Sequence, residues 1–210
     1  MLLLIAFAGG LDATAFLGVG GVFVANQTGN ATLLAMAVAG THSGNTAAAG
    51  MSLVCFFVVA ALGGRLFSTI PPGQRWPART STGIAIEVVL VAIGALLAGL
   101  DTYAAVVVAP LAMAMGLQAA LAARLALEHL TGGFITGATT LAAMTSPLGD
   151  GSNRWWWYVL APITMLVIAA GSVSVVAEQT VSGALLLAAL VAVGALLLSR
   201  DRERRAAARA

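Results

Sequence analysis

The sequence has no lysine, one cysteine and few charged residues of any kind. A lone cysteine, Cys55, excludes an intrachain disulfide and a cysteine-based metal cluster. Charged residues make up 9% of the chain, whereas soluble domains carry about 25%. With 60% hydrophobic residues, the chain lacks the polar side chains that a water-facing surface needs. The composition therefore predicts an integral membrane protein with almost no soluble portion.

Several chemistries lack the motifs that they require. The sequence contains no HExxH, GxSxG or phosphate-binding glycine loop, so an intramembrane enzyme is the least favoured class and no cofactor or metal is expected. The sequence pI near 9.3 does not indicate nucleic-acid binding, because the arginines lie at the ends of apolar segments and in the C-terminal stretch. That placement is typical of membrane topology signals and of contact with anionic lipid.

Long apolar runs dominate the chain. Six of them approach the roughly 20 residues with which a helix crosses about 30 Å of hydrocarbon. Two shorter segments, 22–42 and 131–147, each begin with a β-like stretch, turn at a Thr-Gly pair and continue as a helix too short to cross alone. The pattern predicts an all-α polytopic membrane protein with two re-entrant or broken helices. The six long runs are 1–20, 47–68, 82–100, 103–126, 155–176 and 181–199.

The sequence also repeats itself. Three short matches recur in the same order, each about 100 to 108 residues further along the chain. They predict a first repeat over 1–101 and a second over 102–199, each with three spans and one broken segment, followed by a basic cytoplasmic tail at 200–210. The matches pair Gly10-Leu-Asp-Ala13 with Gly116-Leu-Gln-Ala119, Thr28–Met36 with Thr136–Met144, and Val91–Leu97 with Val191–Leu197.

The arginines orient the two halves. If both short segments re-enter, all ten arginines fall on the face that holds the C-terminal tail, as the positive-inside rule predicts. If both crossed, Arg65, Arg75, Arg79 and Arg124 would move to the opposite face. We therefore expect six spans in a bacterial inner membrane, both termini in the cytoplasm, and two halves of opposite orientation. A strand and a half-helix can together cross a bilayer, so the crossing alternative stays open.

The two broken segments are the predicted substrate-binding site. Inverted repeats with interrupted helices bind solute near the membrane midplane, where free N–H groups at a half-helix start favour anions or polar acceptors. The alternative is that the polar side chains there only cap helices and satisfy backbone groups. The side chains are Asn26, Gln27, Thr28, Asn30 and Thr32 in the first half and Thr131, Thr136, Thr139 and Thr140 in the second.

Two acidic residues within the spans are candidates for proton coupling. Asp12 lies in the middle of the first span, where a carboxylate must pair, face a cavity or be protonated. Its counterpart in the repeat is Gln118, a further candidate for substrate binding. The alternative for Asp12 is a structural hydrogen bond to the neighbouring broken helix. Glu87 ranks second, and it could instead reach Arg79 or snorkel to the interface.

A family resemblance covers nearly the whole chain. The stretches Gly10–Leu17 and Gly21–Asn30, with Gly116-Leu-Gln-Ala119 and Phe134-Ile-Thr-Gly137, resemble the YoaK-type family of bacterial membrane proteins, a domain of unknown function. The most specific part is Val-Ala-Asn-Gln-Thr-Gly-Asn at 24–30. The resemblance implies about six spans and no established substrate.

The function expected from these features is that of a small-solute transporter or channel. Its solute would be polar or anionic, and the site would lie between the two half-helix starts. A non-transporting structural or sensor protein is the alternative, and an intramembrane enzyme is the third class. Membrane lipid is expected to surround the protein. The many small residues on the helix faces are compatible with a homodimer.

Overall fold

The structure, a computed structural model, describes residues 2–41, 44–68, 80–124, 134–147, 155–178 and 180–207. All regular secondary structure in these ranges is helical. The helices are α1 (Leu2–Gly18), α2 (Gln27–Val38), α3 (Thr46–Leu66), α4 (Thr80–Gly99), α5 (Ala104–Arg124), α7 (Phe134–Thr145), α8 (Trp155–Glu178) and α9 (Val181–Ala207).

In the described part of the chain, four helices are long and apolar enough to cross a membrane: α3, α4, α5 and the first 21 residues of α9. Large apolar side chains are exposed along them, among them Phe57, Val89, Leu96 and Leu190. Such surfaces would be unstable in water and suit contact with lipid. The chain is therefore a multi-pass membrane protein.

The two short segments differ in detail from the sequence prediction. No strand forms over residues 22–26, so the predicted β-like stretch is wrong there, and the corresponding stretch at 131–133 lies outside the described residues. The Thr-Gly pairs are not turns either. Thr28 lies in the first turn of α2, which begins at Gln27, and Thr136 lies in the first turn of α7, which begins at Phe134. Both short helices have 12 residues, about 18 Å at 1.5 Å per residue.

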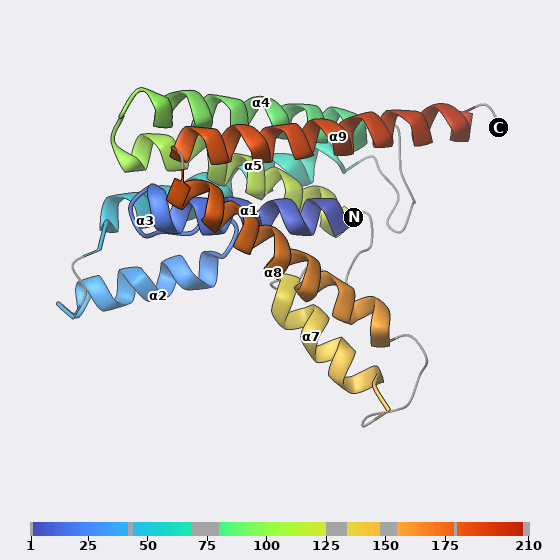
Figure 1. Ribbon diagram of the computed structural model, residues 1–210, viewed down its shortest axis with the longest axis horizontal. Helices are drawn as coiled ribbons and strands as arrows, with labels where there is room; N and C mark the ends of the chain where they lie inside the picture. The colour runs from blue at the N-terminus through green and yellow to red at the C-terminus, as the bar shows by residue number, and fades with distance from the viewer. Residues whose placement is uncertain are drawn as a thin grey trace.

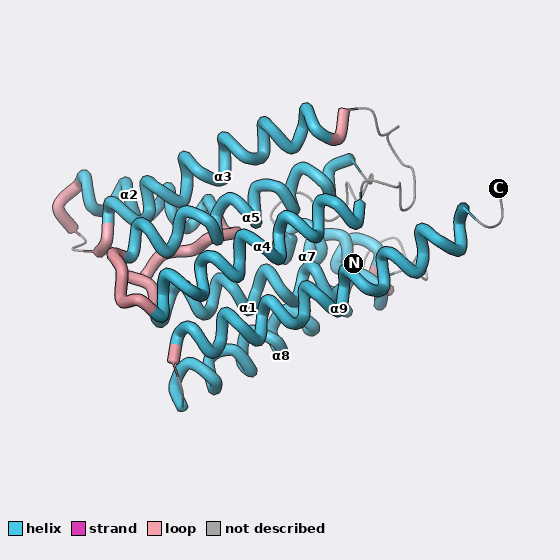
Figure 2. The backbone as a smooth tube through the Cα atoms, turned by 90° about the horizontal axis from the view of Figure 1, so that it is seen from above, coloured by secondary structure: helices cyan, strands magenta, loops and turns pink. Residues whose placement is uncertain are grey.

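The long helices α3, α5, α4 and α9 pack side by side in that order (Figure 2), α1 packs against α9, and α8 packs mainly against α1. The short helices lie outside this row: α2 packs on α3, and α7 packs on α8 (Figure 1). Each begins near the middle of the molecule's length, and they run toward opposite ends (Figure 1). The predicted tail continues α9 as a helix as far as Ala207.

Close helix contacts depend on glycine. A Cβ on Gly116 of α5 would meet the backbone of Phe56 and Ala60 in α3. A Cβ on Gly10 of α1 would meet the Ser172 hydroxyl of α8 at 2.8 Å. Small residues let helix backbones approach closely, which is how helices associate in lipid. The two glycines matched by the repeat thus lie at the α3–α5 and α1–α8 contacts.

The core lies among α1, α3, α4, α5 and α9. It includes Val22 and Val24 of the segment that joins α1 to α2. A second, smaller cluster contains Phe67, Ile84, Leu117 and Leu121. The joining segment is therefore anchored in the protein interior by apolar side chains.

Candidate functional site

The segment between α1 and α2 turns back into the bundle at two glycines. Gly20 and Gly21 have φ values of +105° and +72°, a region that side-chain-bearing residues rarely adopt. After this turn, the side chains of Val22 and Val24 are buried at 1% and 0% exposure. The backbone N–H groups that follow carry no strand or helix bond of their own, so they need acceptors.

Asp12 supplies these acceptors. One carboxylate oxygen, Oδ1, accepts the N–H groups of Val24 and Ala25, both at 2.7 Å. The other, Oδ2, accepts the N–H group of Asn26 at 3.1 Å. The side chain is only 7% exposed. A buried carboxylate is stabilised by such charge-assisted hydrogen bonds, so Asp12 ties the middle of α1 to the start of α2.

A second polar group, centred on Asn30, joins α2 to α3. Its Oδ1 accepts the Phe23 N–H group at 2.9 Å, and its Nδ2 lies 2.7 Å from the Phe23 carbonyl oxygen. Nδ2 also donates to Oε1 of Gln27 and to Oγ of Ser52, each at 3.0 Å. The Ser52 hydroxyl donates in turn to the Phe23 carbonyl at 2.8 Å. Asn30 and Ser52 are fully buried, so the contact between α2 and α3 is built on hydrogen bonds.

The start of helix α2 is fixed by a capping side chain and by a close contact with an aromatic ring. Asn26 is the N-cap, and its side chain accepts the Gly29 N–H group at 3.2 Å. A Cβ on Gly29 would lie 2.6 Å from the ring of Phe23, which stacks on Phe16 at a centroid distance of 4.9 Å. Gly29 is therefore needed for close packing and not for a turn.

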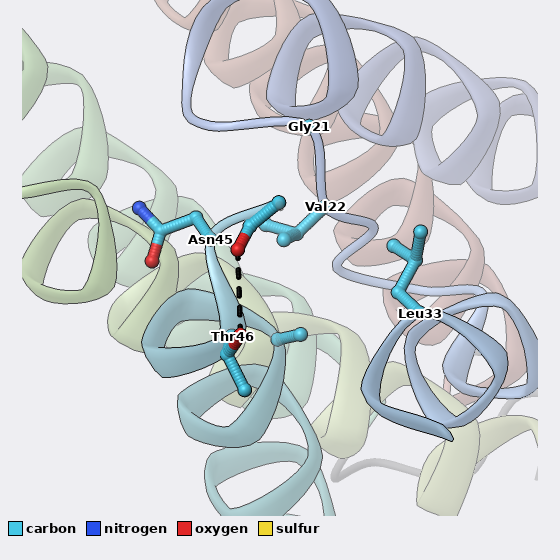
Figure 3. A pocket seen from close by; sticks show the side chains of 7 residues that line it. Gly21, Val22, Leu33, Asn45 and Thr46 are labelled. Carbon is cyan, nitrogen blue, oxygen red and sulfur yellow. Dashed lines mark hydrogen bonds between the residues drawn. The ribbon is translucent and has the colours of Figure 1, made fainter. Parts of the chain in front are cut away.

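A shallow hollow lies beside this segment, at the end where α3 begins (Figure 3). It is bordered by Gly21 and Val22, by Leu33 of α2, and by the N-cap of α3, Asn45. Among the residues that border it, Thr46 donates to the Gly44 carbonyl at 3.3 Å, the dashed line in Figure 3. The space in the hollow suffices for about one water molecule. The hollow is therefore too small for a solute larger than water.

Comparison with protein families identifies the chain. A family model described as "Protein of unknown function (DUF1275)" matches residues 1–198. The chain belongs to the DUF1275 family. No curated protein and no solved structure matches it. The sequence-based expectation of a family of unknown function that covers nearly the whole chain is thus confirmed.

The structure of this DUF1275 member gathers only the first half of the predicted site. Gln27 and Asn30 are hydrogen-bonded to each other at the start of α2, and Asp12 binds the backbone just before it. Asn26 contributes its backbone and a capping oxygen, and its side chain is exposed. Thr28 and Thr32 are exposed on α2, where the Thr32 hydroxyl donates to the Thr28 carbonyl at 2.9 Å.

The second half of the predicted site is separate from the first in this conformation. Thr139 and Thr140 are exposed on α7, which packs against α8 and not beside α2 (Figure 1). Thr136 lies on the same helix, and Thr131 lies outside the described residues. Gln118 is buried in α5 at 3% exposure. The facing of the two half-helix starts therefore stays a prediction.

Ser52 and Thr80 are among the buried polar residues of this DUF1275 protein that sequence reasoning missed. Ser52 is the only polar side chain in α3 between its first turn and Cys55, and it shares the buried face of Ala48 and Ala49. Thr80, the first residue of α4, is 0% exposed. A hydroxyl on the apolar face of a helix was the available signal in both cases, because a buried hydroxyl without a partner is unfavourable.

Proposed function

We propose that this DUF1275 protein transports a small polar solute across the membrane. The observation that carries the proposal is the pair of 12-residue helices that begin near the middle of the molecule and run toward opposite ends (Figure 1). Interrupted helices of opposite direction are typical of inverted-repeat transporters.

The helix contacts support an inverted repeat. Exchanging α1 with α5, α2 with α7, α3 with α8 and α4 with α9 turns the α3–α5 contact into the α1–α8 contact. The same exchange relates α2–α3 to α7–α8 and α4–α5 to α1–α9. The glycines matched by the repeat, Gly10 and Gly116, lie at the first of these related pairs. Two halves that fold alike and point in opposite directions suit alternating access.

The proposed solute is polar, and a neutral solute suits the first half better than an anion. The three N–H groups before α2 already donate to the carboxylate of Asp12. An anion at this place would therefore be repelled by the negative charge of Asp12. Exposed Thr28 and Asn26 and half-buried Gln27 are the side chains that a solute could reach. The conformation described is then the closed one, and opening requires α2 to move relative to α3.

Thermal unfolding across a panel of small polar solutes tests this function. A solute at 100 times its Kd raises the free energy of unfolding by about 2.7 kcal/mol, and we expect the stabilising solute to enter proteoliposomes. Thr28→Val should weaken both the thermal stabilisation by the solute and its uptake. Thr32→Val, the same change one turn further along α2, should leave stabilisation and uptake unchanged. A panel in which nothing stabilises the protein and nothing enters would contradict transport.

A second candidate function is supported by the completeness of the hydrogen bonds. Every oxygen of Asp12 and the amide of Asn30 have backbone or side-chain partners, as a purely structural brace requires. A non-transporting structural or sensor protein therefore remains the alternative. This alternative predicts that Thr28→Val and Thr32→Val show the same unfolding temperature shift and the same uptake with every solute in the panel.

Surface labelling tests the proposed six spans. In a Cys55→Ala background, cysteines at Tyr103 and Thr180 should react from the same face of the membrane, and a cysteine at Ser68 from the other. Tyr103 is 87% exposed, and Thr180 and Ser68 are also exposed. If both short segments crossed, three crossings would separate Tyr103 from Thr180. Labelling of these two from opposite faces would therefore remove the re-entrant arrangement.

A further inference from the structure

Glu87 occupies a position that an acidic side chain rarely takes. It lies on the buried face of α4, one turn from Ile84 and one turn from Val91, which are both 0% exposed. Its own exposure is 1%, which rules out snorkelling to the interface. The seven residues from Thr80 place it about 10 Å along the helix axis. It therefore separates the two apolar clusters, with Val91 in one and Ile84 in the other.

No group in the described part of the chain hydrogen-bonds to Oε1 of Glu87, which is buried. Charged neighbours are missing on the helices that pack against α4. Helix α5 has no titratable side chain before Arg124, and α9 has none before Arg200. Arg79, the partner considered from sequence, lies outside the described residues.

The packing of α4 against α5 shows which polar residue of α5 lies at the same height in the bundle as Glu87. Gly94 packs on Leu111 and Gly83 packs on Leu121, and these contacts place Glu87 level with Gln118. An amide carries no charge, so it cannot balance a carboxylate. An ionised carboxylate without a counter-charge is very unfavourable in an apolar interior. The closed bundle therefore suits a Glu87 that carries a proton.

Along α4 itself, the other buried polar side chains lie on one side of Glu87 only, beyond Ile84. Thr80, on the same face of α4, has a buried hydroxyl without a hydrogen-bond partner in the described structure. Next to it, the Ser81 and Ser199 hydroxyls join α4 to α9 at 3.0 Å. Toward the other end, the buried face continues as Val91 and Ala95, packed against core residues of α5. The end at which α4 begins is therefore the side of Glu87 on which buried hydroxyl groups lie along this helix.

We propose that Glu87 is a proton-binding site that exchanges its proton with the solution at the Thr80 end of α4. When the α4–α9 contact loosens, the carboxyl group releases its proton to water and becomes a carboxylate, and reprotonation accompanies closure. As the driving step of solute movement, this role rests on the proposed transport function. It assigns coupling to Glu87 and leaves Asp12, with its three backbone donors, as the brace of α2.

Infrared spectroscopy of the intact protein in lipid vesicles tests the site without any solute. We expect the C=O stretching band of a protonated carboxyl group at neutral pH, and we expect this band to disappear in Glu87→Gln and to persist in Asp101→Asn. In D2O the band should shift, and Thr80→Val should slow that shift at least several-fold. Glu87→Gln keeps the shape of the side chain, so its unfolding temperature should be unchanged or higher.

Two results would overturn the site. One is a carboxyl band that persists in Glu87→Gln. The other combines two observations: the native protein lacks the band, and Glu87→Gln unfolds at a lower temperature than the native protein. Together they would identify an ionised, paired Glu87. The spectra also separate this inference from the transport proposal. Proton-driven solute uptake that continues in Glu87→Gln would overturn the inference alone, whereas a band that behaves as expected in a protein that moves no solute would overturn transport alone.

Discussion

Replacement of Asp12 with alanine is expected to lower the free energy of unfolding by more than about 4 kcal/mol. The change leaves the N–H groups of Val24, Ala25 and Asn26 without the carboxylate that accepts all three. Each buried donor left unpaired costs about 1–3 kcal/mol, and whole domains are stable by only about 5–15 kcal/mol. Thermal unfolding in detergent measures the loss, and faster hydrogen exchange at residues 24–26 locates it.

Asparagine at the same position separates the two roles considered for Asp12. Its oxygen can still accept two N–H groups, but its amide nitrogen would face the N–H group of Asn26, so a loss of about 2–3 kcal/mol is expected. Asp101→Asn is the matched control, because Asp101 is exposed and its φ of +49° suits asparagine. That control should change stability by less than about 0.5 kcal/mol. A stable Asp12→Asn protein that has lost only the pH dependence of transport would show that Asp12 is the coupling group.

Formate offers a second check on the same contact. In Asp12→Ala the three N–H groups form an empty carboxylate position, and formate is small enough to take it. We expect formate to raise the unfolding temperature of Asp12→Ala more than that of the native protein, in which the position is filled. Equal effects on both proteins would mean that the N–H groups do not hold a carboxylate.

The case of Asp12 shows how far sequence reasoning reaches at this site. A carboxylate within an apolar run has to be paired, and that much follows from the sequence alone. Its partner could not be predicted, because the N–H groups of residues 24–26 reach it only after the chain reverses at Gly20 and Gly21. Ser52 went unnoticed for a related reason. One hydroxyl in an apolar helix is ordinarily satisfied by its own backbone, and only the docking of α2 gives it the role seen here.

The helices followed from run length, whereas the broken segment did not follow from local propensity. Each long apolar run corresponds to a helix, because unpaired backbone groups are very unfavourable in lipid. The valines at 22 and 24 suggested a strand, but the Val24 N–H group donates to the Asp12 side chain of α1 instead. The start of α2 is set by the Asn26 cap, and the glycine assigned to a turn serves contact with Phe23. Tertiary contacts outweighed local preference at each of these positions.

Asn30→Asp is expected to destabilise the protein by about 3–5 kcal/mol, although it changes one atom and hardly alters the shape of the side chain. The amide nitrogen of Asn30 donates to the Phe23 carbonyl, the Gln27 amide oxygen and the Ser52 hydroxyl. A carboxylate oxygen in its place would face two acceptors at about hydrogen-bond distance, and the position is 0% exposed. Such a buried, unpaired charge is highly unfavourable. The unfolding temperature should fall, and α2 should lose protection from hydrogen exchange while α4 and α5 keep theirs.

Asn45→Asp is the matched control for this substitution. Asn45 is the exposed N-cap of α3, and its side-chain oxygen accepts the Ala48 N–H group at 3.0 Å. Aspartate caps a helix as well as asparagine does, and its charge is favourable at a helix start by about 0.3–1 kcal/mol. The same chemical change should therefore leave or raise stability at Asn45 and lower it at Asn30. Equal and small effects at both positions would mean that α2 does not dock on α3 through the amide of Asn30, and the closed arrangement of the first broken segment would then be wrong.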